Sequence, residues 1–216
     1  MVKFPKLTTS ELIKRLTPPT GKVRLVLDTD TYNEIDDQFA VVHALLSPDN
    51  LTLESIHAAP FSNSRSKNPA DGMEKSYQEA LSLLGRLDVE PKGLVYRGST
   101  AYLDNMENPQ ESEATDNLIK QAIVSDDLNP LYVVAIGAIT NVATAILLEP
   151  TIIEKIVVVW LGGHAHYWPN TLEFNLRQDI KASKLIFDCG VPLVQIPCAG
   201  VADHLATTVP EIERHI

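Results

Sequence analysis

Short apolar runs alternate along the chain with longer segments in which apolar residues recur at helical spacing. The run Ile156–Trp160 is apolar at every position, which is typical of strands that helices cover on both faces of a parallel sheet. The predicted strands are Val23–Asp28, Leu51–Ala59, Gly93–Arg97, Leu131–Ile136, Lys155–Leu161 and Pro192–Pro197.

Helical segments lie between these strands, and the last of them is followed by Gly190 as a C-cap. Regular alternation of strand and helix predicts an α/β fold with a doubly wound, mostly parallel sheet, in which ligands bind beyond the carboxyl ends of the strands. No linker or repeat divides the chain, so residues 1–216 are expected to form a single domain that begins with a polar leader, residues 1–22. The predicted helices are Ile35–Leu46, Gly72–Leu84, Ala114–Val124, Asn141–Leu148 and Ile180–Asp188.

The last residues carry the signals of a helix start. Thr207 and Thr208 are capping hydroxyls, Pro210 suits a first helical turn, and Glu211 and Glu213 favour a helix N-terminus. A helix that begins so near the last residue buries little surface, so we expect that the C-terminal part of a longer fold is absent.

The composition is that of a globular protein. Of 216 residues, 44% are hydrophobic and 21% are charged. The net charge of -10, without any basic run, argues against nucleic acid or an anionic membrane as the partner. Cys189 and Cys198 are too few for a disulfide framework and are expected to be reduced thiols. No signal peptide and no bilayer-spanning apolar run is present, so a cytoplasmic location is expected.

Two pairs of aspartates flank the loop after the first predicted strand. Asp28 and Asp30 point the same way from the strand end, and Asp36 and Asp37 fall in the first turn of the next helix, where Asn33 is the predicted cap. Such close carboxylates raise each other's pKa unless a cation neutralises them, and a hard divalent ion, Ca²⁺ before Mg²⁺, is the expected partner. The alternative is that these acids only complement a helix dipole or cap a turn. The predicted buried stripe of that helix is Ile35, Phe39, Val42 and Leu46.

Two known acidic loops can be compared with this one. An EF-hand loop that starts at Asp28 would need Gly at its sixth position and Glu at its twelfth, where Asn33 and Phe39 stand, so it is excluded. A Mg²⁺-dependent phosphatase of the haloacid dehalogenase type also begins with Asp-x-Asp after a strand. In that alternative Asp28 would be the nucleophile and Asp30 the acid/base, while Tyr32 departs from the usual Thr or Val.

Three motifs together resemble the inosine-uridine preferring nucleoside hydrolase family. The string Asp28–Asp37 is similar to its Asp-x-Asp-x-x-x-Asp-Asp signature, with a loop two residues longer. Ala135–Ala143 is similar to its Gly-x-x-Thr-Asn segment, and Leu161–Gly163 followed by Glu173–Asn175 is similar to its Gly-Gly and Glu-Phe-Asn pattern. The resemblance covers roughly residues 23–200 and implies a nucleoside hydrolase-like, Rossmann-like core.

The resemblance implies an N-glycosyl hydrolase of purine and pyrimidine salvage that splits ribonucleosides into ribose and free base with one Ca²⁺. Asp30 and Asp37 would be metal ligands together with the main-chain carbonyl of Thr140, and Asp30 would also be the general base. Asp36 would bind a ribose hydroxyl and Asp28 would support the cluster. The remaining substrate-binding residues implied are Glu173 and Asn175, on an extended segment, with Asn170 and Asn63.

One part of the family pattern is missing. The family supplies a further Ca²⁺-ligating Asp, often beside a His, from a region beyond Ile216, and Asp203–His204 comes too early to match it. The resemblance implies that the hydrolase is a dimer or tetramer. A second alternative is a truncated relative that binds a cation and ribose but has impaired catalysis. The dehalogenase-type phosphatase is the third alternative.

Overall fold

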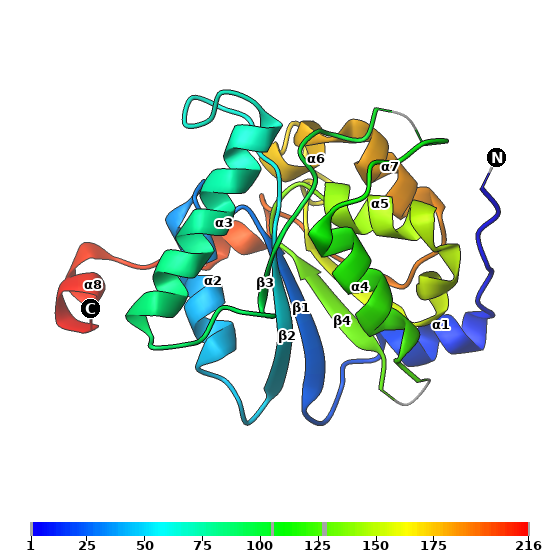
Figure 1. Cartoon of the computed structure of the whole chain (residues 1–216), viewed down its shortest axis with the longest axis horizontal. Coiled ribbons are helices and arrows are strands. Elements are labelled where there is room, and N and C mark those ends of the chain that lie inside the picture. Colours follow the sequence, from blue (N-terminus) through cyan, green and yellow to red (C-terminus); the bar gives the residue numbers. More distant parts are fainter. Residues whose placement is uncertain (1, 105, 127–128, 216) are drawn as a thin grey trace.

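A computed structural model of the chain describes residues 2–104, 106–126 and 129–215, and a six-stranded sheet forms its centre (Figure 1). All strand pairs are parallel, in the order β3-β2-β1-β4-β5-β6. The chain winds outward from β1 to one edge and then from β4 to the other, so a topological switch point lies between these two strands. The predicted α/β class is confirmed. The strands are β1 (Val23–Thr29), β2 (Leu51–Ala58), β3 (Val95–Arg97), β4 (Leu131–Ala135), β5 (Ile156–Leu161) and β6 (Leu193–Ile196).

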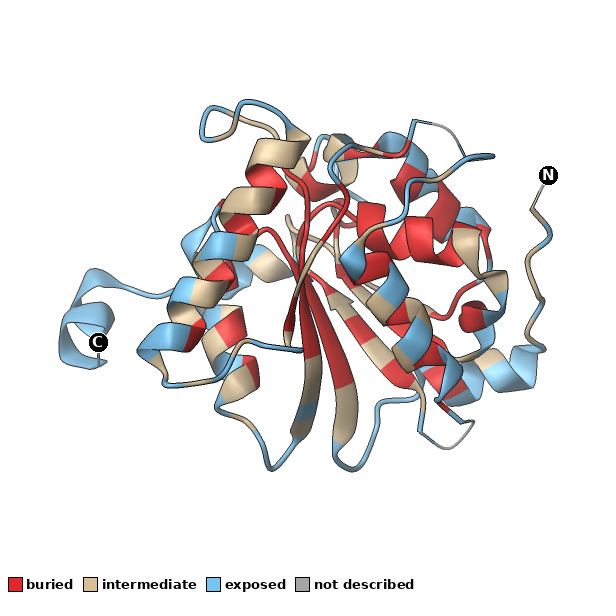
Figure 2. Cartoon of the chain, viewed as in Figure 1, coloured by how far each residue is buried: buried red, intermediate tan, exposed pale blue. Residues whose placement is uncertain are grey.

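Helices cover both faces of this sheet and create two hydrophobic cores (Figures 1 and 2). Leu25 and Leu27 pack with α2 and α3, whereas Val26 between them packs with α4, α5 and α7 on the opposite face. Burial on both faces is the reason that the central residues of β1, Leu25–Leu27, are all apolar. The helices, with η for 3₁₀, are α1 (Thr9–Leu16), α2 (Ile35–Leu45), α3 (Pro69–Arg86), α4 (Glu113–Ile123), α5 (Thr140–Leu148), η1 (Pro150–Glu154), α6 (Phe174–Gln178), α7 (Ile180–Asp188), η2 (Ala202–His204) and α8 (Val209–His215).

The polar leader contains a helix that the hydrophobic pattern did not indicate. Thr8 and Glu11 form a capping box that starts α1, in which each side chain bonds to the other residue's backbone N–H. The helix α3 also begins earlier than predicted, at Pro69 rather than Gly72, because the Asn68 side chain accepts a hydrogen bond from the Asp71 N–H at 2.9 Å. Local capping chemistry therefore set both helix starts.

The buried face of α2 differs from the prediction. Asp37, Val41 and Ala44 are buried, whereas Ile35, Phe39 and Leu46 are 68%, 49% and 67% exposed. The Asp37 carboxylate accepts a hydrogen bond from the Thr29 hydroxyl, which turns this side of the helix toward the end of β1. This polar contact and the buried Val41 and Ala44 thus lie on one side of the helix, whereas three residues of the expected apolar stripe are exposed and the fourth, Val42, is half-buried.

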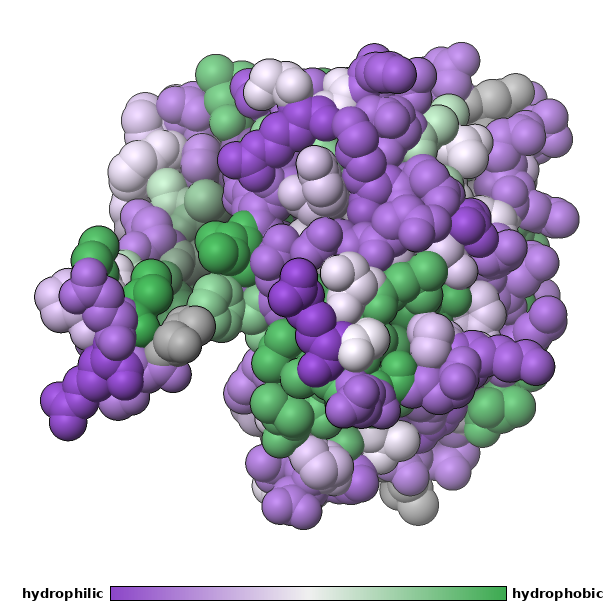
Figure 3. Space-filling model, turned by 60° about the vertical axis from the view of Figure 1, so that its left-hand side comes forward, coloured by the Kyte–Doolittle hydropathy of each residue, from purple (hydrophilic) through white to green (hydrophobic). Residues whose placement is uncertain are grey.

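The predicted helix near the end of the chain is present as α8, and none of its described residues is buried. It stands apart from the α/β body beside α2 and α3 (Figure 1). Leu205 and Val209 are 94% and 67% exposed. Figure 3 shows a hollow between this segment and the body, with hydrophobic residues on both sides.

Two smaller predictions concern thiols and membranes. Cys189 and Cys198 are free cysteines, as expected. In the ranges that the structure describes, no helix combines the length and the apolar character that a bilayer crossing requires.

Candidate functional site

The candidate site lies at the carboxyl ends of β1 and its neighbours, and Asp28 is its most deeply buried carboxylate. Asn141, near the start of α5, donates from Nδ2 to Asp28 Oδ2 at 2.8 Å and to the Ala58 carbonyl at 3.2 Å. The second oxygen, Asp28 Oδ1, is buried and has no hydrogen-bond partner among the described residues. Burial raises the pKa of Asp28 to about 7, although the bond from Asn141 lowers it.

Asp30 follows β1 directly and is held by the loop after it. Its carbonyl accepts a hydrogen bond from the Asn33 N–H at 2.6 Å, and its Oδ2 accepts one from Asn33 Nδ2 at 3.0 Å. Asn33 therefore braces Asp30 and does not cap α2, where Glu34 holds the N-cap position without a side-chain hydrogen bond. Asn63 donates from Nδ2 to Asn33 Oδ1 at 2.7 Å. The predicted substrate residue Asn63 is thus brought to the acidic loop, as a support for Asn33.

Asp37 is the second buried acid of the loop, while Asp36 beside it is exposed. Burial, and after it the charge of Asp37, holds the pKa of Asp30 well above its usual range. Burial also raises the pKa of Asp37, against the bond from Thr29, and the charges of Asp36 and Glu34 raise it further. Two buried carboxylates that oppose each other's ionisation have the electrostatics of a cation site.

The described residues supply only part of a metal coordination shell. No group of three or more His, Cys, Asp or Glu side chains in the described ranges has the arrangement to hold a metal ion. Asp30 and Asp37 offer hard oxygen donors of the kind that Ca²⁺ prefers, but Ca²⁺ takes about six to eight oxygens. Thr140, the first residue of α5, is buried, and its hydroxyl donates to Asp179 Oδ2 at 2.8 Å. The residues fit a calcium site in donor chemistry, and further oxygens are needed to complete it.

The Glu-Phe-Asn motif has a different conformation from the one predicted. The segment is not extended, because Phe174 begins α6 and Glu173 is its N-cap. The Glu173 carboxylate accepts three backbone hydrogen bonds, from Gly163 and Leu176 at 2.8 Å and from Asn175 at 2.9 Å. These bonds fix the start of α6 beside the Gly-Gly turn.

Asn175 extends this anchor to the sheet. Its Nδ2 donates to the carbonyls of Ile136 and Leu161, at 2.8 and 3.0 Å, just past β4 and at the end of β5. Asn170 lies in the exposed loop before α6, where its side chain accepts from the Leu172 N–H at 3.0 Å. Glu173 and Asn175 are thus built into the sheet edge, whereas Asn170 lies outside it.

Asp179, which the sequence did not single out, and Tyr102 also belong to the site. Asp179, the N-cap of α7, accepts from the Leu103 N–H at 2.7 Å as well as from Thr140. Burial raises the pKa of Tyr102, and the charges of Asp179 and Asp30 raise it further, so its hydroxyl lies in the field of the acidic cluster. The position of Asp179 directly before a predicted helix was a usable capping signal. Tyr102 could be singled out in its loop only by its aromatic ring, on which a nucleobase can stack.

Solved structures of similar fold are enzymes and effectors. The chain is 24% identical to the "Purine-Preferring Ribonucleoside Hydrolase from Gardnerella vaginalis" with a TM-score of 0.62, over 81% of this chain and 60% of that one. It is 16% identical to "type III effector protein XopQ complexed with adenosine diphosphate ribose", with a TM-score of 0.59, over 88% and 61%. At these identities the likeness establishes the fold alone.

Sequence relatives point in the same direction. The chain is 28% identical over 191 residues to the pyrimidine-specific ribonucleoside hydrolase RihA of Enterobacter sp. (strain 638), which is 79% of this chain and 58% of that protein. It is 27% identical over 200 residues to RihA of Klebsiella pneumoniae (strain 342), or 83% and 61%. The chain thus spans less than two thirds of these relatives' length.

The acidic loop, the Thr-Asn start of α5 and the Glu-Phe-Asn cap lie on one edge of a parallel sheet, in the order that the family resemblance requires. The profile of the family described as "Inosine-uridine preferring nucleoside hydrolase" matches residues 25–215, which include all of these elements. The chain therefore belongs to the inosine-uridine preferring nucleoside hydrolase family.

Proposed function

We propose that this chain hydrolyses the N-glycosidic bond of ribonucleosides to ribose and free base. The observation that carries the proposal is the pair of buried aspartates, Asp30 and Asp37, at the switch point of the sheet. The family match, which covers residues 25–215 of the chain, includes both of them. Uncharged ribonucleosides suit this site, because the carboxylates of Asp28, Asp30 and Asp37 would repel an anionic substrate. The cytoplasmic location remains a prediction from the sequence. The assembly into a homodimer or homotetramer also remains a prediction.

Asp30 and Asp37, with the main-chain carbonyl of Thr140, are the residues that would hold Ca²⁺. When bound, this ion lowers the pKa of a water molecule and orients it. Asp30 acts as the general base, because burial gives its carboxylate a high proton affinity. The exposed Asp36 carboxylate is free to accept a hydrogen bond from a ribose hydroxyl. Asp28 supports the cluster through its bond with Asn141.

Glu173 and Asn175 contribute to the ribose subsite in this proposal. A carboxylate has about four acceptor positions, and three of those of Glu173 are used by backbone N–H groups. The remaining position can accept a ribose hydroxyl. Asn175 uses its Nδ2 on two carbonyls, which leaves its Oδ1 as the group that would face substrate. Carboxylate and amide oxygens near the sugar stabilise the positive charge that develops on it in the transition state.

Release of free ribose from inosine and uridine, with added Ca²⁺ or with a chelator, tests this proposal. Asp30→Asn is expected to reduce kcat by roughly 10²- to 10⁴-fold, the usual contribution of a general base. Asp49→Asn is the matched control, since Asp49 is an exposed aspartate in the turn before β2. Equal rates for Asp30→Asn and the control would contradict the assignment of Asp30.

A cation- and ribose-binding relative with impaired catalysis is the second candidate. It is favoured by the incomplete set of side-chain metal ligands among the described residues. Retained Ca²⁺ binding without ribose release from any nucleoside would support it. The phosphatase alternative is set aside, because the family match includes the acidic loop on which it rested.

A further inference from the structure

A polar cavity lies at the opposite end of the strands from the acidic cluster. It has a volume of about 310 Å³ and is enclosed by the leader, α1 and the end of η1. Lys155 directly precedes β5, so the cavity lies at the amino ends of the strands. Four cations line it together with two carboxylates: Lys6, Lys14, Arg15 and Lys155 with Glu11 and Glu154.

The charge of this cavity is opposite to that of the whole chain. Its lining has a formal charge of +2, whereas the chain carries -10. Over the ranges that the structure describes, no carboxylate lies within 4.0 Å of the ammonium groups of Lys6, Lys14 or Lys155, although Lys75 and Lys181 both have ion pairs. Among the described residues, no ion pair therefore neutralises the positive charge of these three lysines.

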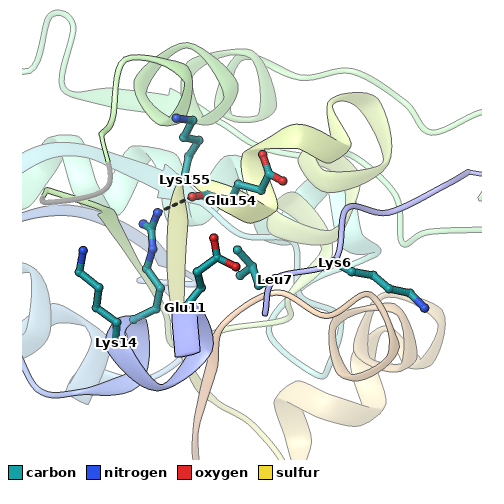
Figure 4. Close-up of a pocket in the computed structure, with 7 residues that line it drawn as sticks. Lys6, Leu7, Glu11, Lys14, Glu154 and Lys155 are labelled. Carbon is teal, nitrogen blue, oxygen red and sulfur yellow. Dashed lines mark hydrogen bonds between the residues drawn. The ribbon is translucent and has the colours of Figure 1, made fainter. Parts of the chain in front are cut away.

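Glu11 and Arg15 are held by contacts of their own. Glu11 accepts hydrogen bonds from the Thr8 backbone N–H at 2.6 Å and from the Thr8 hydroxyl at 2.7 Å, which commits it to the capping box. Arg15 is only 7% exposed and donates from Nη2 to the Glu154 carbonyl at 2.6 Å, the dashed contact in Figure 4. Arg15 thus provides a rigid cationic wall to the cavity.

Figure 4 shows Lys6, Lys14 and Lys155 at separate places around the cavity, from the leader, α1 and the residue after η1, with ammonium groups that point apart. A lysine ammonium is carried on a flexible four-carbon stem, so these side chains can turn toward one shared anion. The family match starts at residue 25, so three of the four cations come from a segment that precedes it. The cavity is thus largely a feature of this chain's own leader.

We propose that this cavity binds a small phosphate-bearing anion. Several ammonium groups around one guanidinium give the multiple charged donors that phosphate oxygens accept. The volume is near the lower end of small-molecule pockets, which begin at about 300 Å³, so the space suits inorganic phosphate or a sugar phosphate. The phosphate group is the common chemistry of both sources.

Calorimetric titration of the whole chain with inorganic phosphate, ribose 5-phosphate and uncharged ribose, at constant ionic strength, tests this proposal. Saturable binding of either phosphate compound, and none of ribose, is expected. Tighter binding of ribose 5-phosphate would identify the sugar phosphate as the ligand, whereas equal binding would show that the phosphate group alone is recognised. Absence of saturable binding by both would overturn the proposal.

Variants connect the binding to the cavity. Removing one exposed cation from an ion pair costs roughly 1.5- to 5-fold in affinity, so Lys14→Gln with Lys155→Gln should weaken binding roughly 2- to 25-fold. Lys184→Gln is the matched control, because Lys184 is an exposed lysine of α7 outside the cavity lining. An unchanged far-ultraviolet spectrum confirms that each variant is folded. Equal affinity of the double variant and the wild-type chain, or an equal loss in the control, would refute the site.

Discussion

Replacement of Asn141 by alanine tests how the buried end of β1 is held together. Asn141 is fully buried and bonds to three chain segments: the Asp28 carboxylate in β1, the Ala58 carbonyl in β2 and the Ser99 N–H after β3. Gly98 makes room for it, because a Cβ at that position would lie 2.5 Å from Asn141 Nδ2. Alanine would leave all three partners buried without their bond.

The expected loss of stability follows from those partners. A hydrogen bond to a charged group contributes about 1.5–3 kcal/mol, and an orphaned buried N–H costs about 1–3 kcal/mol. Together they predict a loss of roughly 2.5–6 kcal/mol for Asn141→Ala, a large share of the 5–15 kcal/mol typical of a folded protein. The loss depends on pH, because the bond from Asn141 holds down a raised Asp28 pKa of about 7.

The raised pKa of Asp28 fixes the sign of this pH dependence. A carboxyl group whose pKa is higher in the folded than in the unfolded state destabilises the fold when it is ionised, and protonation relieves the penalty as pH falls. Asn141→Ala raises the Asp28 pKa further, so its cost should be larger at pH 8.5 than at pH 5.

Urea unfolding at the two pH values, with a chelator present, measures the loss of stability as a shift of the urea midpoint, provided that the m-value is unchanged. Asn50→Ala is the matched control, an exposed asparagine in the turn before β2, with an expected change within about 0.5 kcal/mol. An Asn141→Ala midpoint equal to that of the control, or the same loss at both pH values, would refute this account of Asp28.

Three further predictions concern other buried positions. Burial lowers the pKa of His57 to about 4. Because the unfolded chain binds this proton more tightly than the folded one, the free energy of unfolding should fall as pH drops from about 6.5 toward 4. In urea titrations, His57→Gln should make that loss smaller. Trp160 is fully buried and donates to the Gly137 carbonyl at 3.1 Å, so Trp160→Ala should cost about 3–5 kcal/mol in chemical unfolding, whereas the 41% exposed Trp168 should tolerate alanine with a much smaller loss. A Cβ on Gly98 would lie 2.0 Å from the Ala58 carbonyl oxygen while one on Gly85 meets nothing within 4 Å; Gly98→Ala should therefore lower the thermal midpoint, and Gly85→Ala in α3 should raise stability by about 0.5–1 kcal/mol.

Local patterns in the sequence were sufficient for the architecture and for the acidic loop. Apolar runs such as Ile156–Trp160 predicted buried parallel strands, because a strand covered on both faces has no polar face to show. The spacing of Asp28, Asp30 and Asp37 predicted a group of carboxylates at the end of β1, because the positions of strand and helix fix where these side chains begin. These properties depend on neighbours within a few residues, which the sequence displays directly.

The roles of individual side chains were decided by contacts between distant segments. Asn141 bonds to Asp28 across 113 positions of the chain, and Asp37 turned α2 so that Phe39 faces outward. Glu173 caps α6 through the local N–H groups of Asn175 and Leu176, and it also accepts from the Gly163 N–H, ten positions earlier in the chain. The sequence by itself therefore determined the sheet, its helices and the location of the acids. Only the tertiary structure decided which polar groups pair, because a buried donor takes the acceptor that folding brings within reach, however far apart the two lie in the chain.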